Sequence, residues 1–247
     1  MKSVLKASAA IVLCVGVAAP AFAQAQGGNQ NPPQTQPQPI PSPSRVDRYP
    51  NGNYFEREFD RRKIDFSSPD IAIAYRDSKS VAGCLASIEE GPLSPYVGGP
   101  LSEDPKYKLL SKRLRKSADK CIKPNPAALQ MLVGASIAEL QVLGHEGTYE
   151  PRAMSLNSDE AEAFYTPKNG SATVDHIGRC VAVYSPGLSV DVLKAEVGSP
   201  AEEQALDKLY KSTPECGLSA RPASVPNVLQ RAAIAFGLHD WNAAHGG

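Results

Sequence analysis

Four of the five cysteines in this 247-residue chain form two pairs with nearly the same spacing. Cys84 and Cys121 have 36 residues between them, and Cys180 and Cys216 have 35. Four cysteines allow three disulfide pairings, and pairing within each pair is the most economical because the two intervening segments are so similar. Each bond would stabilise the fold by about 3 to 4 kcal/mol through the entropy of loop closure. The chain is therefore predicted to contain two units of similar size, each with one disulfide.

A repeated stretch surrounds the first cysteine of each pair. Residues 81–91 align without gaps with residues 177–187, at an offset of 96. In both copies the apolar residues and the cysteine recur at positions i, i+3, i+4 and i+7, which places them on one face of an α-helix. We expect Asp77 and Thr173 to cap the starts of these helices, and a glycine, Gly187 in the second copy, to end each of them.

Two further helices are predicted in each copy. Pro105 and Pro200 each follow a residue that can cap a helix, and proline is favoured at the first helical position because its missing N–H would be unbonded there. These second helices bring the second cysteine of each pair toward the buried face, although Pro214 ends the regular helix just before the last cysteine. Third helices are expected after Pro126 and Pro226, where apolar residues again recur at helical spacing.

Together these patterns predict an all-α protein of two tandem three-helix repeats, each cross-linked by one disulfide. The repeats follow N-terminal segments of different composition. The predicted parts are a signal peptide (1–23), a disordered Pro/Gln-rich leader (24–44), an N-terminal extension (45–76), the first helical repeat (77–143), an inter-repeat linker (144–173) and the second helical repeat (174–247).

The N-terminus has the three parts of a secretory signal peptide. Lys2 and Lys6 precede an apolar run over residues 9–19, and a small-residue site ends at Ala23, where cleavage is predicted. Cys14 raises the alternative of a lipoprotein, but a lipobox needs a small residue just before its cysteine and a leucine stands there. We expect a periplasmic or secreted protein without a membrane span, in a compartment where disulfides form.

The leader over residues 24–44 consists almost wholly of Gln, Pro, Asn, Gly and Ser. Such a segment has too little apolar surface to offset the entropy lost on ordering, so a disordered tether is predicted. A proline-rich ligand for an aromatic groove is the alternative function of this segment. A short helix is expected over residues 54–63, within the N-terminal extension.

One predicted helix departs from the overall charge balance of 26 basic and 26 acidic residues, a balance that gives no reason to expect nucleic-acid binding. Residues 103–123 contain eight basic and three acidic side chains, whereas the matching helix of the second copy is acidic. We predict an anion-binding face for an anionic envelope component or an acidic protein. Docking of one copy on the other, or neutral drift of exposed residues, are the alternatives. The candidate residues are Lys108, Lys112, Arg113, Arg115, Lys116 and Lys120.

Motifs for catalysis or metal binding are sparse. His176 and Cys180 are four residues apart on a predicted helix, as two zinc ligands can be, but zinc needs a further ligand and a reduced cysteine. Ser136 lies in a loose likeness of a nucleophile elbow, yet inside an amphipathic helix, where a packing role is favoured. His145 and His239 each neighbour a carboxylate in sequence, without a paired Ser or Cys. We therefore predict no catalytic residue, no metal and no cofactor.

The stretches Cys84-Leu-Ala and Cys180-Val-Ala are each followed by a proline-led helix that ends near a cysteine. In this they resemble a family of uncharacterised exported proteins from alphaproteobacteria, in which short helical modules repeat such a cysteine pair. The resemblance covers residues 77–140 and 174–240. It implies an all-helical fold and an envelope location, and it implies no activity and no catalytic residue.

The sequence therefore favours a binding or scaffolding module over an enzyme. The alternative is a small envelope hydrolase or glycan-processing enzyme, with a site between the copies that uses His145, His176 or His239. The two functions make different structural demands. An enzyme needs acid, base or nucleophile groups that converge in a cavity, whereas a binding module needs only a groove or a patch.

Overall fold

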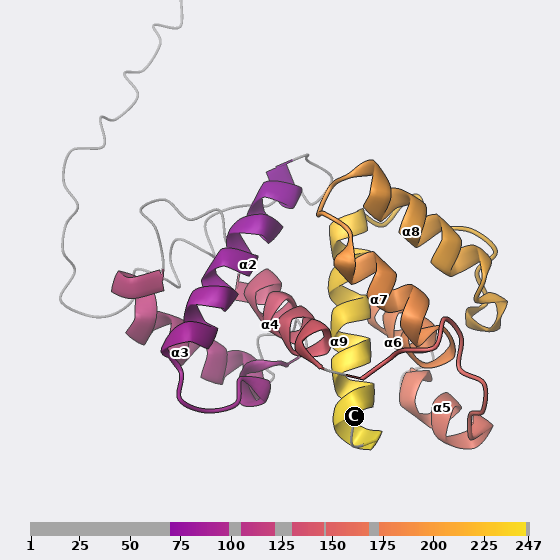
Figure 1. Ribbon diagram of the computed structural model, residues 1–247, viewed down its shortest axis with the longest axis horizontal. Helices are drawn as coiled ribbons and strands as arrows, with labels where there is room; N and C mark the ends of the chain where they lie inside the picture. Colours follow the sequence, from indigo (N-terminus) through magenta and orange to yellow (C-terminus); the bar gives the residue numbers. More distant parts are fainter. Residues whose placement is uncertain (1–69, 99–104, 122–129, 146, 168–172, 246–247) are drawn as a thin grey trace, which may run out of the picture. The chain divides into compact units, whose positions relative to one another are not determined.

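The computed structural model describes residues 70–98, 105–121, 130–145, 147–167 and 173–245, all within one compact unit that spans residues 48–247. The described residues form eight α-helices and two short 3-10 helices and contain no strand (Figure 1), which confirms the all-helical prediction for this part of the chain. The elements are α2 (Asp70–Ile88), η1 (Ser94–Tyr96), α3 (Pro105–Cys121), α4 (Gln130–Gly144), α5 (Ser158–Tyr165), α6 (Val174–Tyr184), α7 (Pro186–Lys194), α8 (Pro200–Lys211), η2 (Pro214–Cys216) and α9 (Asn227–His245).

The predicted signal peptide, the leader and the helix expected over residues 54–63 lie outside the described residues. Within them, no helix combines the length and the apolar character needed to cross a membrane.

Several helix ends agree with the local sequence signals. α3 begins at Pro105 and α8 at Pro200, and the Ser199 hydroxyl accepts the backbone N–H of Glu202 at 3.2 Å as a helix cap. α8 ends before Pro214, which opens the separate 3-10 turn η2 that carries the last cysteine. These ends were predictable because proline and a capping hydroxyl act on the residues beside them.

Two predicted helix boundaries are wrong. α2 begins at Asp70 rather than Asp77, because Ile71, Ala74 and Tyr75 extend its buried face by two turns. In the second copy, Gly187 does not end a helix: α6 ends at Tyr184, and Gly187 lies in the first turn of α7, a helix that the repeat pattern did not predict.

The inter-repeat segment explains why a glycine is needed at the start of α7. The backbone N–H of Gly187 donates to the carbonyl of Glu150 at 2.9 Å. A Cβ at Gly187 would stand 2.6 Å from that same oxygen, closer than side chains approach backbone atoms in folded proteins. The segment before α5 thus crosses α7 directly against its backbone.

Helices α4 and α9 form the centre of the described fold. Both are buried along most of their length, and α4 packs against α2, α9 against α6, and the two against each other. In Figure 1, α9 stands between α2 and α4 on one side and α7 and α8 on the other. A helix that is apolar or small on most of its faces is expected in such an interior position.

Two disulfides cross-link the helices with the expected pairing. Cys84 of α2 bonds to Cys121 of α3, and Cys180 of α6 bonds to Cys216 of η2, with Cα atoms 5.5 and 5.7 Å apart. Each bond therefore ties the first predicted helix of a copy to the end of its second.

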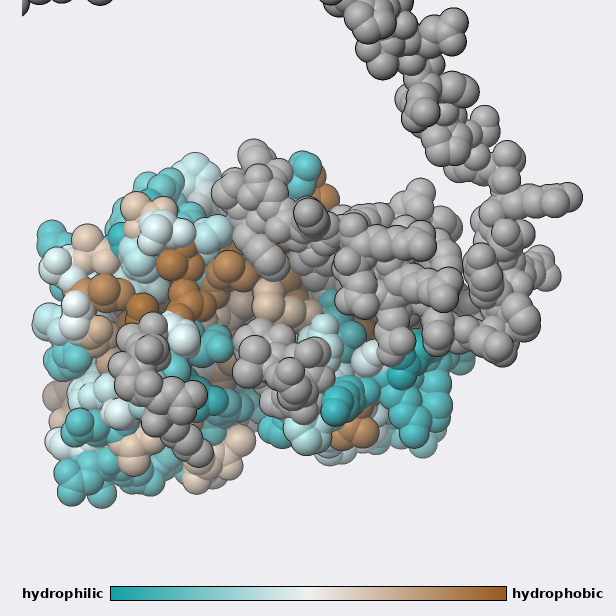
Figure 2. Space-filling view, turned by 180° about the vertical axis from the view of Figure 1, so that it is seen from behind, coloured by the Kyte–Doolittle hydropathy of each residue, from teal (hydrophilic) through white to brown (hydrophobic). Residues whose placement is uncertain are grey.

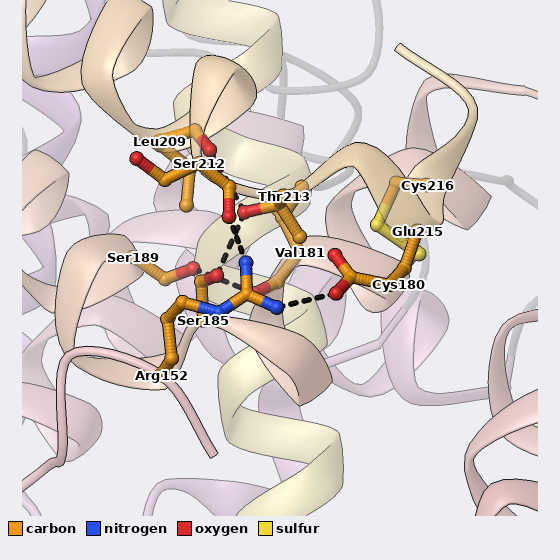
Figure 3. Close-up of a disulfide and its surroundings, with 10 residues drawn as sticks. All are labelled: Arg152, Cys180, Val181, Ser185, Ser189, Leu209, Ser212, Thr213, Glu215 and Cys216. Carbon is orange, nitrogen blue, oxygen red and sulfur yellow. Dashed lines mark hydrogen bonds and ion pairs between the residues drawn. A yellow bond between two sulfur atoms is a disulfide. The ribbon is translucent and has the colours of Figure 1, made fainter. Parts of the chain in front are cut away.

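Polar contacts surround the second disulfide (Figure 3). The Ser185 hydroxyl lies 2.7 Å from that of Thr213, which in turn donates to the carbonyl of Leu209 at 2.8 Å. Arg152, from the inter-repeat segment, donates to the carbonyl of Ser212 and forms an ion pair with Glu215. These bonds fix the turn that carries Cys216 against the end of α6.

The crossing of α6 and α9 depends on the absence of side chains. A Cβ on Gly178 would lie 2.5 Å from the backbone carbonyl of Ala233, and one on Gly237 would lie 2.8 Å from the carbonyl oxygen of Gly178. By contrast, no atom of the described residues lies within 4 Å of the Cβ position of Gly83, an exposed glycine inside α2. A side chain at Gly178 would therefore meet the α9 backbone, whereas one at Gly83 would meet no described residue.

We predict that Gly178→Ala lowers the free energy of unfolding by about 1 to 3 kcal/mol, because the new methyl group forces the α6 and α9 backbones apart. Gly83→Ala is the matched control and should raise it by up to about 1 kcal/mol, because alanine restricts the unfolded chain without a clash. Urea denaturation followed by circular dichroism measures both. Equal stability of the two variants would contradict the close crossing.

Candidate functional site

Arg231 of α9 is a fully buried charged residue in the centre of the fold. Its Nε and Nη2 atoms donate to both carboxylate oxygens of Glu139 in α4, at 2.9 and 2.8 Å. Its Nη1 donates to Glu202 of α8 at 2.9 Å and to the carbonyls of Val192 and Ala195 at 2.9 and 3.0 Å. A single guanidinium therefore joins α4, α8, α9 and the end of α7.

Other polar groups complete this ion cluster, which we define as Tyr75, Lys79, Glu139, Glu202 and Arg231. From α2, the Tyr75 hydroxyl and the Lys79 ammonium both donate to Glu139, at 2.9 and 2.6 Å. The second carboxylate oxygen of Glu202 accepts the backbone N–H of Gly198, in the turn between α7 and α8, at 2.7 Å. Two cations thus balance two carboxylates, which makes their burial possible.

The charges of the cluster shift the pKa values of its members. Burial alone would raise the pKa of Glu139, but the hydrogen bonds and charges of Arg231 and Lys79 hold that pKa below its ordinary value of 4.5. Burial and the Glu139 carboxylate raise the pKa of Tyr75 well above 10.0, so its hydroxyl stays protonated and donates. Shifted pKa values often mark active sites, but the side chains of Arg231, Glu139 and Glu202 have no exposed surface that a ligand could reach. The cluster is a structural feature.

A cavity of about 150 Å³ opens between the C-terminal ends of α4 and α9, beside η1. It lies between helices of the segments that the sequence predicts as two repeats, and its lining includes His145 and His239. The third candidate histidine, His176, lies in the first turn of α6, outside the cavity. The lining residues are Ser94, Gln141, Val142, His145, His239, Asn242 and Ala243.

Hydrogen bonds fix several of the side chains in this cavity. The Gln141 amide donates to the Ser94 hydroxyl at 3.0 Å, and the Asn242 amide donates to the Tyr149 hydroxyl at 2.6 Å. His239 is buried, with 7% of its surface exposed, and its Nδ1 lies 3.3 Å from the Asp240 carboxylate. Among the described residues, neither His145 nor His239 is bonded to a hydroxyl. Within the part of the chain that the structure describes, no hydroxyl is held by either histidine, as a hydrolytic triad would require.

The remaining chemical candidates have structural roles. Nδ1 of His176 lies 3.1 Å from the backbone nitrogen of Thr173 and 2.8 Å from its hydroxyl, so His176 completes the cap at the start of α6. Its predicted neighbour Cys180 is oxidised in a disulfide. Ser136 is buried within α4. In the described parts of the chain, no three His, Cys, Asp or Glu residues lie close enough to hold a metal ion.

The predicted cationic face lies on α3. Leu110 and Leu114 are buried on the opposite side of the helix, and all the candidate cations except Arg113 are exposed. Arg113 forms an ion pair with Glu89, at the end of α2. In the view from behind, the visible residues on the side where α3 lies are mainly hydrophilic (Figure 2).

Four lysines recur at every fourth residue of α3 and follow a gentle spiral along it, which we call the lysine row: Lys108, Lys112, Lys116 and Lys120. Residues four apart lie on neighbouring turns of a helix, so the row extends for about 18 Å. In the second copy the acidic residues of α8 have internal partners instead. Glu202 is buried in the ion cluster, and Glu203 and Asp207 both pair with Arg221, at 2.6 and 2.9 Å.

Sequence reasoning missed the ion cluster and Tyr149. One signal was present: Glu139 and Arg231 are isolated charges within runs of apolar and small residues. An isolated charge on an otherwise buried helix indicates a buried partner. The sequence contained no local signal that joins two residues 92 positions apart.

Comparison of the chain with protein-family models, curated proteins and solved structures gave no match in any of the three.

We predict that Arg231→Met lowers the free energy of unfolding by about 3 to 5 kcal/mol, because it leaves two buried carboxylates with too little compensating charge. Arg221→Met is the matched control, since Arg221 also binds two carboxylates but at the surface, and its loss should cost about 1 kcal/mol or less. Urea denaturation midpoints measure the difference. If the Arg231 variant is as stable as the Arg221 variant, the cluster does not hold the helices together.

Acid should weaken the fold through Glu139. Because the pKa of Glu139 is lower in the folded protein than its ordinary 4.5, its contribution to stability is complete above that value and disappears as the pH falls through the folded pKa. We predict that stability falls less steeply below about pH 5 in Glu139→Gln than in the wild type. Glu196→Gln, at an exposed position, should keep the wild-type slope. Urea midpoints at a series of pH values test this, and identical slopes for all three proteins would exclude Glu139 as the sensitive group.

Proposed function

We propose that this chain is an exported helical binding module whose first copy binds an anionic component of the cell envelope through the lysine row of α3. In this proposal the two copies are tandem three-helix repeats, with α2, α3 and α4 matched by α6, α8 and α9. The signal peptide over residues 1–23 directs export, and residues 24–44 form a disordered tether. Two disulfides are compatible with a periplasmic or extracellular protein.

The lysine row is the observation that carries the proposal. Neighbouring lysines four apart repel each other and destabilise a helix by about 0.2 to 0.5 kcal/mol per pair. No ion pair from the described residues neutralises Lys108, Lys112, Lys116 or Lys120. An anionic partner along the row would remove this repulsion, whereas the acidic side chains of α8 are already bound within the second copy.

A small hydrolase or glycan-processing enzyme is the second candidate function. The cavity between α4 and α9 supports it, because His145 and His239 both line that cavity. The hydrogen bond from Gln141 to Ser94 argues against it, because the one lining hydroxyl is held by an amide and not by a histidine. We therefore place binding ahead of catalysis.

Charge reversal of the lysine row tests the proposal. The variant Lys108→Glu/Lys112→Glu/Lys116→Glu should bind at least about tenfold more weakly to an anionic probe, because each lysine near an anionic surface contributes about 1 kcal/mol. Two probes separate the possible sources of the anion: vesicles of phosphatidylglycerol, with phosphatidylcholine as the neutral comparison, and an acidic polysaccharide. Co-sedimentation and retention on a polysaccharide column measure binding to the two probes.

The matched control reverses three exposed lysines of the second copy, as Lys194→Glu/Lys208→Glu/Lys211→Glu. It changes the net charge by the same amount and should retain binding within about twofold of the wild type at physiological salt, where distant charges are screened. Equal weakening by both variants would show that net charge alone drives binding. No binding of the wild type to either probe would remove the lysine row from consideration.

A further inference from the structure

The described side chains that line the cavity between α4 and α9 are mostly polar. Of the seven described residues that line it, five carry a hydroxyl, an amide or an imidazole, and none is Asp, Glu, Lys or Arg. A charged ligand would meet no carboxylate, ammonium or guanidinium on these described residues. The cavity is therefore suited to an uncharged ligand that forms hydrogen bonds.

Several hydrogen-bonding atoms of the lining have no partner among the described residues. His239 is more than nine-tenths buried, and its Nδ1 faces Asp240, which leaves Nε2 unbonded. Asn242 uses its Nδ2 to bind Tyr149, which leaves the amide oxygen as an acceptor. His145 is an exposed residue, and no described residue forms a hydrogen bond with its ring nitrogens. Because neighbouring bonds hold Asn242 and Gln141 in place, these groups need little reorganisation to accept a ligand.

The size and walls of the cavity narrow the ligand further. With a volume of about 150 Å³ the cavity, which is open to solvent, has room for about one small ring. The rings of His145 and Tyr149 meet edge to face beside it, with centroids 6.2 Å apart, and Val142 and Ala243 supply apolar surface. A ring with hydroxyl groups at its edge and C–H groups on its faces matches both kinds of wall, since hydroxyls donate to and accept from amides and imidazoles.

We propose that this cavity binds one ring of an uncharged sugar, at the junction of the two copies. The site is separate from the lysine row on α3, and its chemistry is different. Ser94, Gln141, His145, His239 and Asn242 would contact the sugar hydroxyls. No covalent step is involved, so the proposal requires binding only.

Saturation-transfer NMR and calorimetry with glucose, galactose, mannose and N-acetylglucosamine test this proposal. The wild type should bind at least one of the four, with a dissociation constant of about 1 to 10 mM for so small a ligand. Gln141→Ala and Asn242→Ala should each weaken that binding about tenfold, because each removes a hydrogen-bonding group. Gln204→Ala removes an exposed amide on α8 and should leave the affinity within about twofold of the wild type.

Three outcomes overturn the proposal. The first is the absence of saturable binding of all four sugars up to about 100 mM. The second is equal affinity of the wild type and the two cavity variants, which would place the sugar elsewhere. The third is tighter binding of the charged analogues glucuronate or glucosamine, which would contradict the uncharged character of the lining. Circular dichroism of each variant confirms that loss of binding does not come from loss of fold.

Discussion

The guanidinium of Arg231 fixes how the helices of the first copy meet those of the second. Its N–H groups point in set directions within one plane, and the two carboxylates that they reach come from α4 and α8. Apolar contacts fix the spacing of the helices but do not demand one particular set of partners. A forked hydrogen bond to Glu139 does demand one, because a rotation would leave buried charges unbonded. We infer that the cluster specifies the arrangement of the helices more than it adds to net stability.

The two candidate binding surfaces depend on this arrangement to different degrees. Glu139 and Gln141 lie on one helix, and Arg231 and His239 on another, within about 12 Å of each other along the helix axes. By orienting α4 and α9, the cluster also orients the lining of the cavity at their C-terminal ends. Helix α3 is instead held by its disulfide to α2 and by two buried leucines, at a distance from the cluster. The cavity is thus a pre-organised site, whereas the lysine row is a surface on a peripheral helix.

Local signals made part of this structure predictable. Prolines and capping residues set the starts of α3 and α8, and the spacing of the cysteines gave both disulfides. The extra helix α7 was missed because Pro186 and Gly187 together suggest a helix end, although proline also favours a helix start. The acidic composition of the helix that matches α3 gave no sign that Glu202 is buried. Glu202 can be buried because Arg231, 29 residues later in α9, donates to its carboxylate. The sequence suggested His145 and His239 for a site between the copies, but it gave no signal for Ser94, Gln141 or Asn242, which only the tertiary fold brings beside them.

Matched positions in the two copies carry different side chains and therefore make different contacts. At the offset of 96, exposed Gly83 of α2 corresponds to Arg179 of α6. Arg179 pairs with Asp240 and lies 5.3 Å from the ring centre of Phe164, which packs edge to face on Trp241. These contacts attach α5 to α6 and α9, whereas Gly83 has no side chain that could make the equivalent contacts in α2. At this position the second copy therefore has a side chain that serves internal packing, and the first copy has none.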